Sequence, residues 1–192
     1  MNKSNKKILR QYALEYGSFI GTAWFLLFFN YVKSIEHNSV VYAIGILLMI
    51  VVCILFPLLL AVRINKKTTA VDQKMNYGQA FSFFLFMFFF ASVLHSAATY
   101  VYLEYVDQGQ LFISINNMLA MPEIKSTYES LGLANEYAQA LDGLKDIEEA
   151  GNANIALNFL GYDCFLGFFG SIFTSYFASA TIKLKAPQPQ TR

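Results

Sequence analysis

Charged residues are scarce in this chain, and so are the side chains that build most catalytic and metal sites. Lysine, arginine, aspartate and glutamate make up 14% of the 192 residues, whereas soluble domains average about 25%. The two cysteines, Cys53 and Cys164, form no CxxC motif and no cluster with histidine, so neither a metal site nor a disulfide is predicted. The sequence also contains no GxxxxGK[ST], HExxH, GxSxG or GxGxxG motif, which are signatures of common enzyme classes. We therefore expect a protein that is not an enzyme and has no cofactor.

Apolar residues, in contrast, are abundant and gathered into blocks. They make up 56% of the chain, with 19 phenylalanines and 12 tyrosines. The hydrocarbon core of a membrane is about 30 Å thick and needs roughly 20 apolar residues in a spanning helix. Four blocks meet this requirement, at residues 12–32, 40–62, 79–103 and 154–182. The sequence thus predicts an all-α integral membrane protein with four transmembrane helices, in which residues 1–192 form a single membrane domain in contact with the lipid bilayer.

The basic residues predict how these four spans are oriented. Eleven of the fourteen lysines and arginines lie before the first block, between the second and third, or after the fourth. With four spans, these three segments share one side of the membrane, and an excess of basic residues marks the cytoplasmic side. We therefore expect both termini in the cytoplasm, with residues 183–192 as a cytoplasmic tail. A multi-pass protein of a bacterial inner membrane is the predicted localisation.

Residues 104–153 form the one sizeable segment between blocks, and they are predicted to lie outside the cytoplasm. This segment carries nine acidic residues and two lysines. Apolar residues recur at helical spacing in three stretches, around Leu111, Ile124 and Leu141, and Pro122 suits a first helical turn. Gly151 is predicted to end the last stretch before the fourth span. We expect two or three short amphipathic helices here, and we interpret the acidity as a solvated face.

Two ionisable residues fall inside the predicted spans. His95 lies in the third block and Asp163 in the fourth. A carboxylate at the centre of a bilayer costs about 2.5–3.5 kcal/mol on insertion scales, so such groups usually face a partner or water. Spans three and four run antiparallel, and both residues are predicted near the outer ends of their spans. His95 is therefore a candidate partner for Asp163, with tyrosine hydroxyls or interfacial water as the alternatives.

Small residues spaced four apart predict the faces on which the helices pack. Such ridges let helix backbones approach closely, because lipid offers no hydrophobic drive for association. We expect them to join helices within one chain, although contacts between protomers remain the alternative. The predicted packing residues are Gly17 and Gly21 in the first span, Ser92 and Ser96 in the third, and Gly167, Ser171, Ser175 and Ser179 in the fourth.

Several features together resemble a small bacterial membrane family, found mainly in Bacteroidota and known as a domain of unknown function. They are the E-Y-G of residues 15–17, the basic loop leading into Y-G-Q-A-F at residues 77–81, the Met121-Pro122 pair, and a last span rich in Gly and Phe. The resemblance covers most of the chain. It implies a four-helix protein of a Gram-negative inner membrane, and it implies no activity and no catalytic residues.

The leading hypothesis from the sequence is a non-enzymatic membrane protein, such as a scaffold or accessory subunit of the cell envelope. The alternative is a transporter or channel subunit in which Asp163 and His95 lie on the conducting path. A homo-oligomer or a membrane-protein partner is compatible with either. Nucleic acid is not an expected partner, because no surface of interleaved basic and aromatic residues is evident.

Overall fold

The computed structural model describes residues 3–37, 39–70 and 76–183, and every regular element within those ranges is a helix. Four of the helices are long, as the apolar blocks predict. They are α1 (Lys3–His37), α2 (Val40–Ala70), α3 (Tyr77–Val101) and α7 (Asn152–Lys183). The all-α prediction is confirmed. Helices α1, α2 and α7 extend beyond their apolar blocks, whereas α3 begins two residues before its block and ends at Val101, two residues before the block does.

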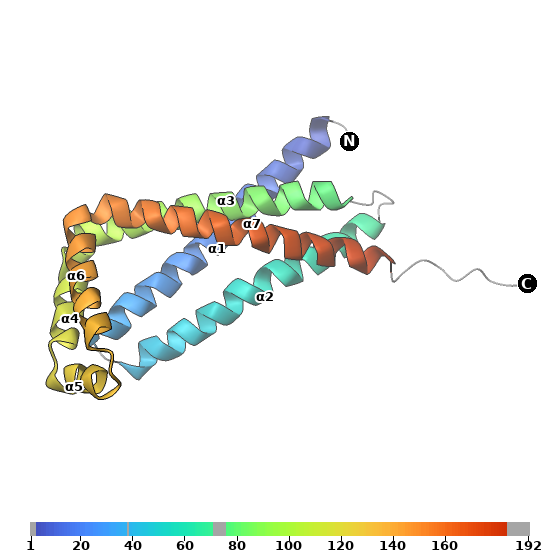
Figure 1. Cartoon of the computed structure of the whole chain (residues 1–192). Coiled ribbons are helices and arrows are strands. Elements are labelled where there is room, and N and C mark those ends of the chain that lie inside the picture. The colour runs from blue at the N-terminus through green and yellow to red at the C-terminus, as the bar shows by residue number, and fades with distance from the viewer. Residues whose placement is uncertain (1–2, 38, 71–75, 184–192) are drawn as a thin grey trace, which may run out of the picture.

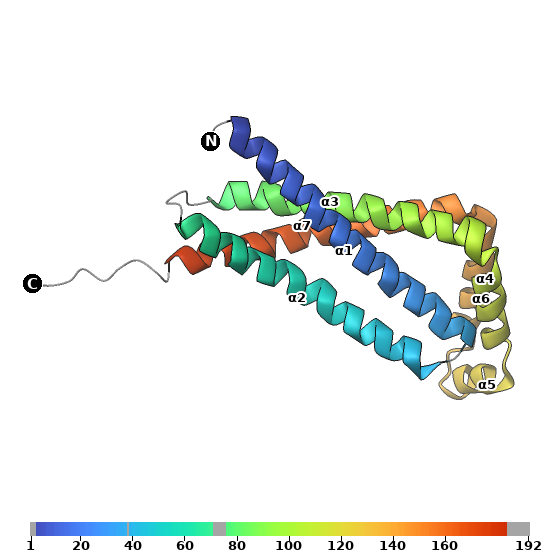
Figure 2. The ribbon, with the colours of Figure 1, turned by 180° about the vertical axis from the view of Figure 1, so that it is seen from behind.

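The four long helices lie side by side, with α3 packed between α1 and α7 (Figures 1 and 2). The start of α1, the end of α2, the start of α3 and the end of α7 gather at one end of the bundle. The turn between α1 and α2 lies at the other end, next to the short helices. Consecutive long helices therefore run in alternating directions, and α3 is antiparallel to α7.

A capping box fixes the start of α3. The Asn76 side chain accepts the backbone N–H of Gln79 at 2.9 Å, and the Gln79 side chain accepts the backbone N–H of Asn76 at 3.2 Å. Each bond satisfies a backbone donor that has no partner within the helix.

The other end of α3 widens into a π-helix, η1 (Tyr102–Asp107). Gln108 follows with a φ of 49°, in the left-handed region that non-glycine residues rarely adopt, and Gly109 follows with a φ of 87°. The chain turns sharply at these two residues before α4 begins. Single π-helical turns are rare and frequently occur at functional sites.

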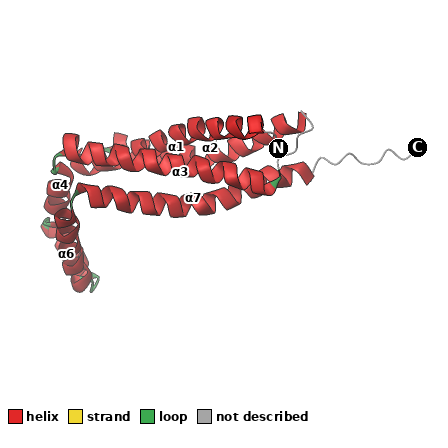
Figure 3. Cartoon of the chain, turned by 90° about the horizontal axis from the view of Figure 1, so that it is seen from above, coloured by secondary structure: helices red, strands yellow, loops and turns green. Residues whose placement is uncertain are grey.

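The segment between α3 and α7 folds into three short helices across the end of the bundle (Figure 3). These are α4 (Gln110–Leu119), α5 (Pro122–Ser130) and α6 (Ala134–Ala150). Pro122 stands at the first position of α5, and Gly151 separates α6 from α7 with a φ of 81°, both as predicted. The Tyr137 hydroxyl donates to the carbonyl of Leu119 at 2.9 Å and holds α6 against the end of α4.

The interior contains two apolar clusters with a polar band between them. One cluster is centred on Phe84 and Met87 of α3, and the other on Phe28 of α1 and Tyr102 of η1. The α3 residues between the two clusters include four buried polar side chains, which are Ser92, His95, Ser96 and Thr99. Polar groups thus line the inside of the bundle at this level.

In the part of the chain that the structure describes, three helices are long and apolar enough to cross a membrane. The qualifying stretches are Val40–Arg63, Tyr77–Asp107 and Asn152–Ala178. Helix α1 contains the first predicted block, residues 12–32, but Glu15, Asn30 and several other polar residues dilute its apolar character. Its membrane crossing, and so the four-span count, remains a prediction.

Candidate functional site: a buried histidine–aspartate pair

The structure brings His95 and Asp163 together in the interior of the bundle. His95 extends from α3 and Asp163 from α7, and the two side chains meet because these helices pack along their length. Nδ1 of His95 lies 2.6 Å from Oδ2 of Asp163. His95 is 5% exposed and Asp163 is 9% exposed. A contact this short between a carboxylate and an imidazole is typical of a charge-assisted hydrogen bond.

Aromatic rings surround the imidazole of His95 on its other sides. The ring centroids of Trp24, Phe28 and Phe159 lie 6.2, 6.3 and 5.4 Å from that of His95. All three rings meet the imidazole at steep angles, from 65° to 74°. This cage excludes water from the pair and strengthens the interaction between its two members, because a low dielectric constant screens charge less.

The second ring nitrogen of His95 is free to take part in chemistry. In the part of the chain that the structure describes, Nε2 is buried and has no hydrogen-bond partner. The same holds for Oγ1 of Thr99, one helical turn further along α3. When Nδ1–H donates to Asp163, Nε2 of a neutral imidazole offers a lone pair; when the ring is protonated, Nε2–H becomes a donor. Nε2 is therefore an unused hydrogen-bonding position inside the bundle.

The two predicted packing serines of α3 flank His95 and have different roles. Ser96 donates from its hydroxyl to the carbonyl oxygen of Ala156 on α7, at 2.6 Å, and so links the two helices. Ser92 instead donates to the carbonyl of Phe88 in its own helix, at 2.8 Å. Both are buried.

The glycine pair of α1 packs directly on α3 within the same chain. A Cβ atom at Gly17 would lie 2.5 Å from the carbonyl oxygen of Met87, and one at Gly21 would lie 2.7 Å from that of Ala91. Real Cβ atoms do not approach backbone oxygens so closely. Only glycine lets the two backbones meet here, as expected for small residues at helix contacts in membranes.

The small residues of α7 show the same principle, with one difference. A Cβ atom at Gly167 would lie 2.8 Å from Cβ of Phe88 on α3. Ser171 and Ser175 are fully buried, but their hydroxyls donate to carbonyls of their own helix. They act as small residues and do not bridge helices by hydrogen bonds. The side chain of Ser179 lies outside the described residues.

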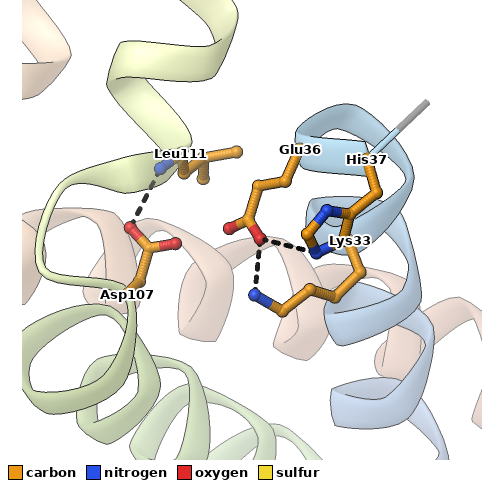
Figure 4. A network of polar contacts seen from close by, with 5 residues as sticks. All are labelled: Lys33, Glu36, His37, Asp107 and Leu111. Carbon is orange, nitrogen blue, oxygen red and sulfur yellow. Dashed lines mark hydrogen bonds and ion pairs between the residues drawn. The ribbon is translucent and has the colours of Figure 1, made fainter.

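A second polar cluster, which the sequence analysis did not identify, occurs at the end of α1 beside the corner between η1 and α4 (Figure 4). Lys33 Nζ lies 2.5 Å from Glu36 Oε2, and His37 Nε2 lies 3.8 Å from the same oxygen. Asp107 faces them from η1 and accepts the backbone N–H of Leu111 at 3.1 Å. The spacing of Lys33 and Glu36 was a signal for an ion pair on one helix face. The sequence analysis treated Asp107 only as one of the nine acidic residues of segment 104–153.

Electrostatics in this second cluster favour a charged lysine. The hydrogen bond to Glu36 raises the pKa of Lys33 above its ordinary value of 10.5, against the opposing effect of partial burial. The ammonium group also lies 5.9 Å from the ring centroids of Phe29 and Tyr102, within the range of a cation–π interaction.

Within the described residues, no group of three or more His, Cys, Asp or Glu side chains is arranged to hold a metal ion. Cys53 and Cys164 are free thiols. The candidate site is thus the buried His95–Asp163 pair, with the charged cluster at the end of α1 as a separate feature.

Comparison with known proteins assigns the chain to a family. The model of a family described as protein of unknown function (DUF4199) matches residues 15–179. The chain belongs to this family, which agrees with the resemblance to a domain of unknown function that the sequence suggested. No curated protein and no solved structure matches the chain.

Proposed function

We propose that the chain is a four-span integral membrane protein of the bacterial inner membrane, with a non-enzymatic role as a scaffold or accessory subunit of the cell envelope. One observation carries the membrane part of this proposal: large apolar side chains cover the outside of the long helices, while polar side chains lie inside. Leu47 of α2 is 64% exposed and Phe173 of α7 is 65% exposed, whereas Ser92, Thr99 and Ser171 are fully buried. Soluble proteins rarely expose such extensive apolar surface.

The proposed four spans are α2, α3, α7 and, in addition, α1. Its residues 12–32 are long enough to cross the hydrocarbon core, and Gly17 and Gly21 seat it on α3 at backbone contact distance. Lipid contact on its outer face is supported by Phe19, which is 52% exposed. Glu15 lies at the start of the block, where its carboxylate can reach the membrane surface.

The orientation follows from the same arrangement. The ends of α1, α2, α3 and α7 that lie close to the basic segments gather at one end of the bundle. That end is assigned to the cytoplasm by the excess of lysine and arginine. Helices α4 to α6, which carry most of the acidic residues, then lie on the outer face.

A scaffold role is favoured because the outer helices offer surface and little chemistry. Phe112 and Leu144 are the buried residues of α4 to α6, while Ile113, Met121 and Leu131 are exposed. Exposed apolar side chains on a layer outside the membrane suit a membrane-protein partner or a second copy of this chain. Mild crosslinking in cells followed by purification identifies which of the two is present.

Topology is the decisive experiment, and it separates four spans from three. Four spans place the two termini on the same side of the membrane, whereas exclusion of α1 places them on opposite sides. Alkaline phosphatase, which is active only outside the cytoplasm, is fused in turn at the N-terminus, at Gly132 and after Arg192. We expect activity at Gly132 alone. Activity at one terminus and not at the other would overturn the four-span arrangement, and activity at both termini with none at Gly132 would overturn the orientation.

A second candidate function, transport of protons or ions, is favoured by one specific observation. The His95–Asp163 pair is buried and surrounded by aromatic rings, and its buried Nε2 has no hydrogen-bond partner among the described residues. Ionisable groups inside a membrane protein frequently mark ion or proton paths. In liposomes that contain the purified chain, proton flux that Asp163→Asn abolishes would support this candidate. Glu129→Gln, at an exposed position of α5, is the control and should leave the flux unchanged; flux equal to that of empty liposomes would exclude transport.

A further inference from the structure

Two buried carboxylate oxygens face each other at the end of α1 without a partner for either. Oε1 of Glu36 and Oδ1 of Asp107 are both buried and have no hydrogen-bond partner among the described residues. Figure 4 shows these two oxygens pointing toward one another across the gap between α1 and η1. Glu36 is close enough to act electrostatically on the carboxyl group of Asp107. Asp107 is 3% exposed, so water does not screen the contact.

The other oxygen of each carboxyl group is already occupied. Oε2 of Glu36 accepts a hydrogen bond from the ammonium group of Lys33 and lies 3.8 Å from Nε2 of His37. Oδ2 of Asp107 accepts a hydrogen bond from the backbone N–H of Leu111. The free oxygens therefore face each other as two acceptors with no donor between them. Two acceptors at such a position repel one another, and where two carboxylates share a site this repulsion favours a proton on one of them.

The charged groups around the pair do not supply the missing donor. Helix α1 contributes Lys33 and His37. The imidazole of His37 faces Oε2 of Glu36 and stacks on Tyr42 of α2. From η1 come Tyr102, whose ring faces Lys33, and Glu104, which accepts from Asn152 of α7. Helix α4 carries no charged residue and contributes only its backbone N–H. With both carboxyl groups ionised, Lys33, Glu36 and Asp107 together would carry one uncompensated negative charge in a buried place.

We propose that Glu36 and Asp107 share one proton between Oε1 and Oδ1, and that this proton fastens the end of α1 to the corner where η1 gives way to α4. A single proton satisfies both unpartnered oxygens and removes the excess negative charge at once. Its loss to solvent at alkaline pH leaves two buried carboxylates in repulsion and separates the two elements. The pair is thus a pH-sensitive latch at the end of the bundle where α4 to α6 lie.

The backbone of this corner is shaped to present Asp107. The π-helical turn of η1 ends at this residue, and Gln108 directly after it adopts a strained left-handed conformation. Strain of this kind persists only where surrounding contacts maintain it. The bond from Leu111 and the shared proton with Glu36 are contacts that hold Asp107 in this place.

Infrared spectroscopy of the full chain in detergent tests the shared proton directly. A protonated carboxylic acid has a carbonyl band that an ionised carboxylate lacks. At neutral pH we expect such a band, and we expect Glu36→Gln and Asp107→Asn each to abolish it completely, because one proton serves both groups. Glu104→Gln, which removes an acid from the same π-helix, and Asp163→Asn should each leave this band in place.

Three infrared outcomes overturn the proposal: no such band in the wild-type chain, a band that neither amide variant removes, or a band that each variant reduces only by half. The last result would indicate two separately protonated acids. Because glutamine and asparagine keep the shape of the acids and can donate a hydrogen bond, both variants should fold, and circular dichroism verifies the helical content of each.

The dependence of melting temperature on pH provides the second measurement. The folded chain holds a proton that the unfolded chain releases above about pH 4, so its stability falls as the pH rises. Because His37 Nε2 lies 3.8 Å from Oε2 of Glu36, the comparison is made in a His37→Gln background. We expect the melting temperature to fall steadily from about pH 5 to about pH 8, and Glu36→Gln to remove this slope. If the melting temperature falls with pH equally steeply when Glu36→Gln is present, the proposed latch is overturned.

Discussion

Removal of the His95–Asp163 contact should destabilise the fold, and a double-mutant cycle measures by how much. Asp163→Ala leaves Nδ1 of a histidine that is 5% exposed without a partner. An unsatisfied buried group of this kind costs about 1–3 kcal/mol. His95→Ala leaves an unpaired carboxylate and also removes the ring that Trp24, Phe28 and Phe159 enclose. We expect this variant to cost more, about 3–5 kcal/mol, as large-to-small changes in aromatic cores do.

The double variant isolates the energy of the contact itself. The loss of ring packing occurs both in His95→Ala and in the double variant, so it cancels in the cycle. What remains is the coupling between imidazole and carboxylate, for which we expect about 1–2 kcal/mol, since hydrogen bonds between membrane helices reach about 1.7 kcal/mol. The double variant should therefore be less destabilised than the sum of the two single variants.

The assay is equilibrium unfolding of the four proteins in mixed micelles, followed by helical circular dichroism. Distant, independent sites add to within about 0.3–0.5 kcal/mol. A coupling energy below that range would refute the reasoning, because it would mean that the 2.6 Å contact adds no net stability. The same unfolding assay, applied to Asp163→Asn, supports the transport test, because a variant that folds but no longer moves protons distinguishes function from stability.

Two further predictions concern the contact between α3 and α7. Gly167→Leu should lower the free energy of unfolding by about 1–3 kcal/mol, because even a Cβ would lie 2.8 Å from Cβ of Phe88. Gly161→Leu on the same helix is the control, because a Cβ atom at Gly161 would have nothing within 4 Å; equal melting temperatures for the two variants would contradict the packing. Ser96→Ala should cost about 1 kcal/mol through loss of its bond to α7, whereas Ser92→Ala, whose bond lies within its own helix, should cost less. The reverse order would show that the bond between the helices contributes no stability.

Several features of this protein were predictable from the sequence because they depend on local chemistry. Long apolar runs indicate helices in lipid as well as in a protein interior, and α2 and α3 begin within two residues of the blocks that predicted them. Pro122 begins α5 and Gly151 ends α6 because proline suits a first helical turn and glycine tolerates a positive φ. The number of helices that cross the membrane is less accessible, since α1 mixes polar residues into its apolar block.

The candidate site shows where sequence reasoning reaches its limit. Counting residues along antiparallel spans identified His95 as a partner for Asp163 by depth. Depth does not specify which way a side chain points around its helix axis, and the rotations of α3 and α7 are set by the packing of Gly167 on Phe88 and by the Ser96 bond. The open Nε2 and the aromatic cage follow from those rotations.

The sequence by itself determined an all-helical chain, the approximate places of its helices and the small residues on which they pack. Each of these depends on neighbours within one or two helical turns. Only the tertiary structure decided that Glu36 and Asp107 face each other, because the two residues are 71 positions apart in the sequence. They meet through a π-helical turn and a strained corner, which no local sequence pattern predicts. Contacts between distant segments depend on the angles and rotations of whole helices, and those are fixed by the packing of all of them together.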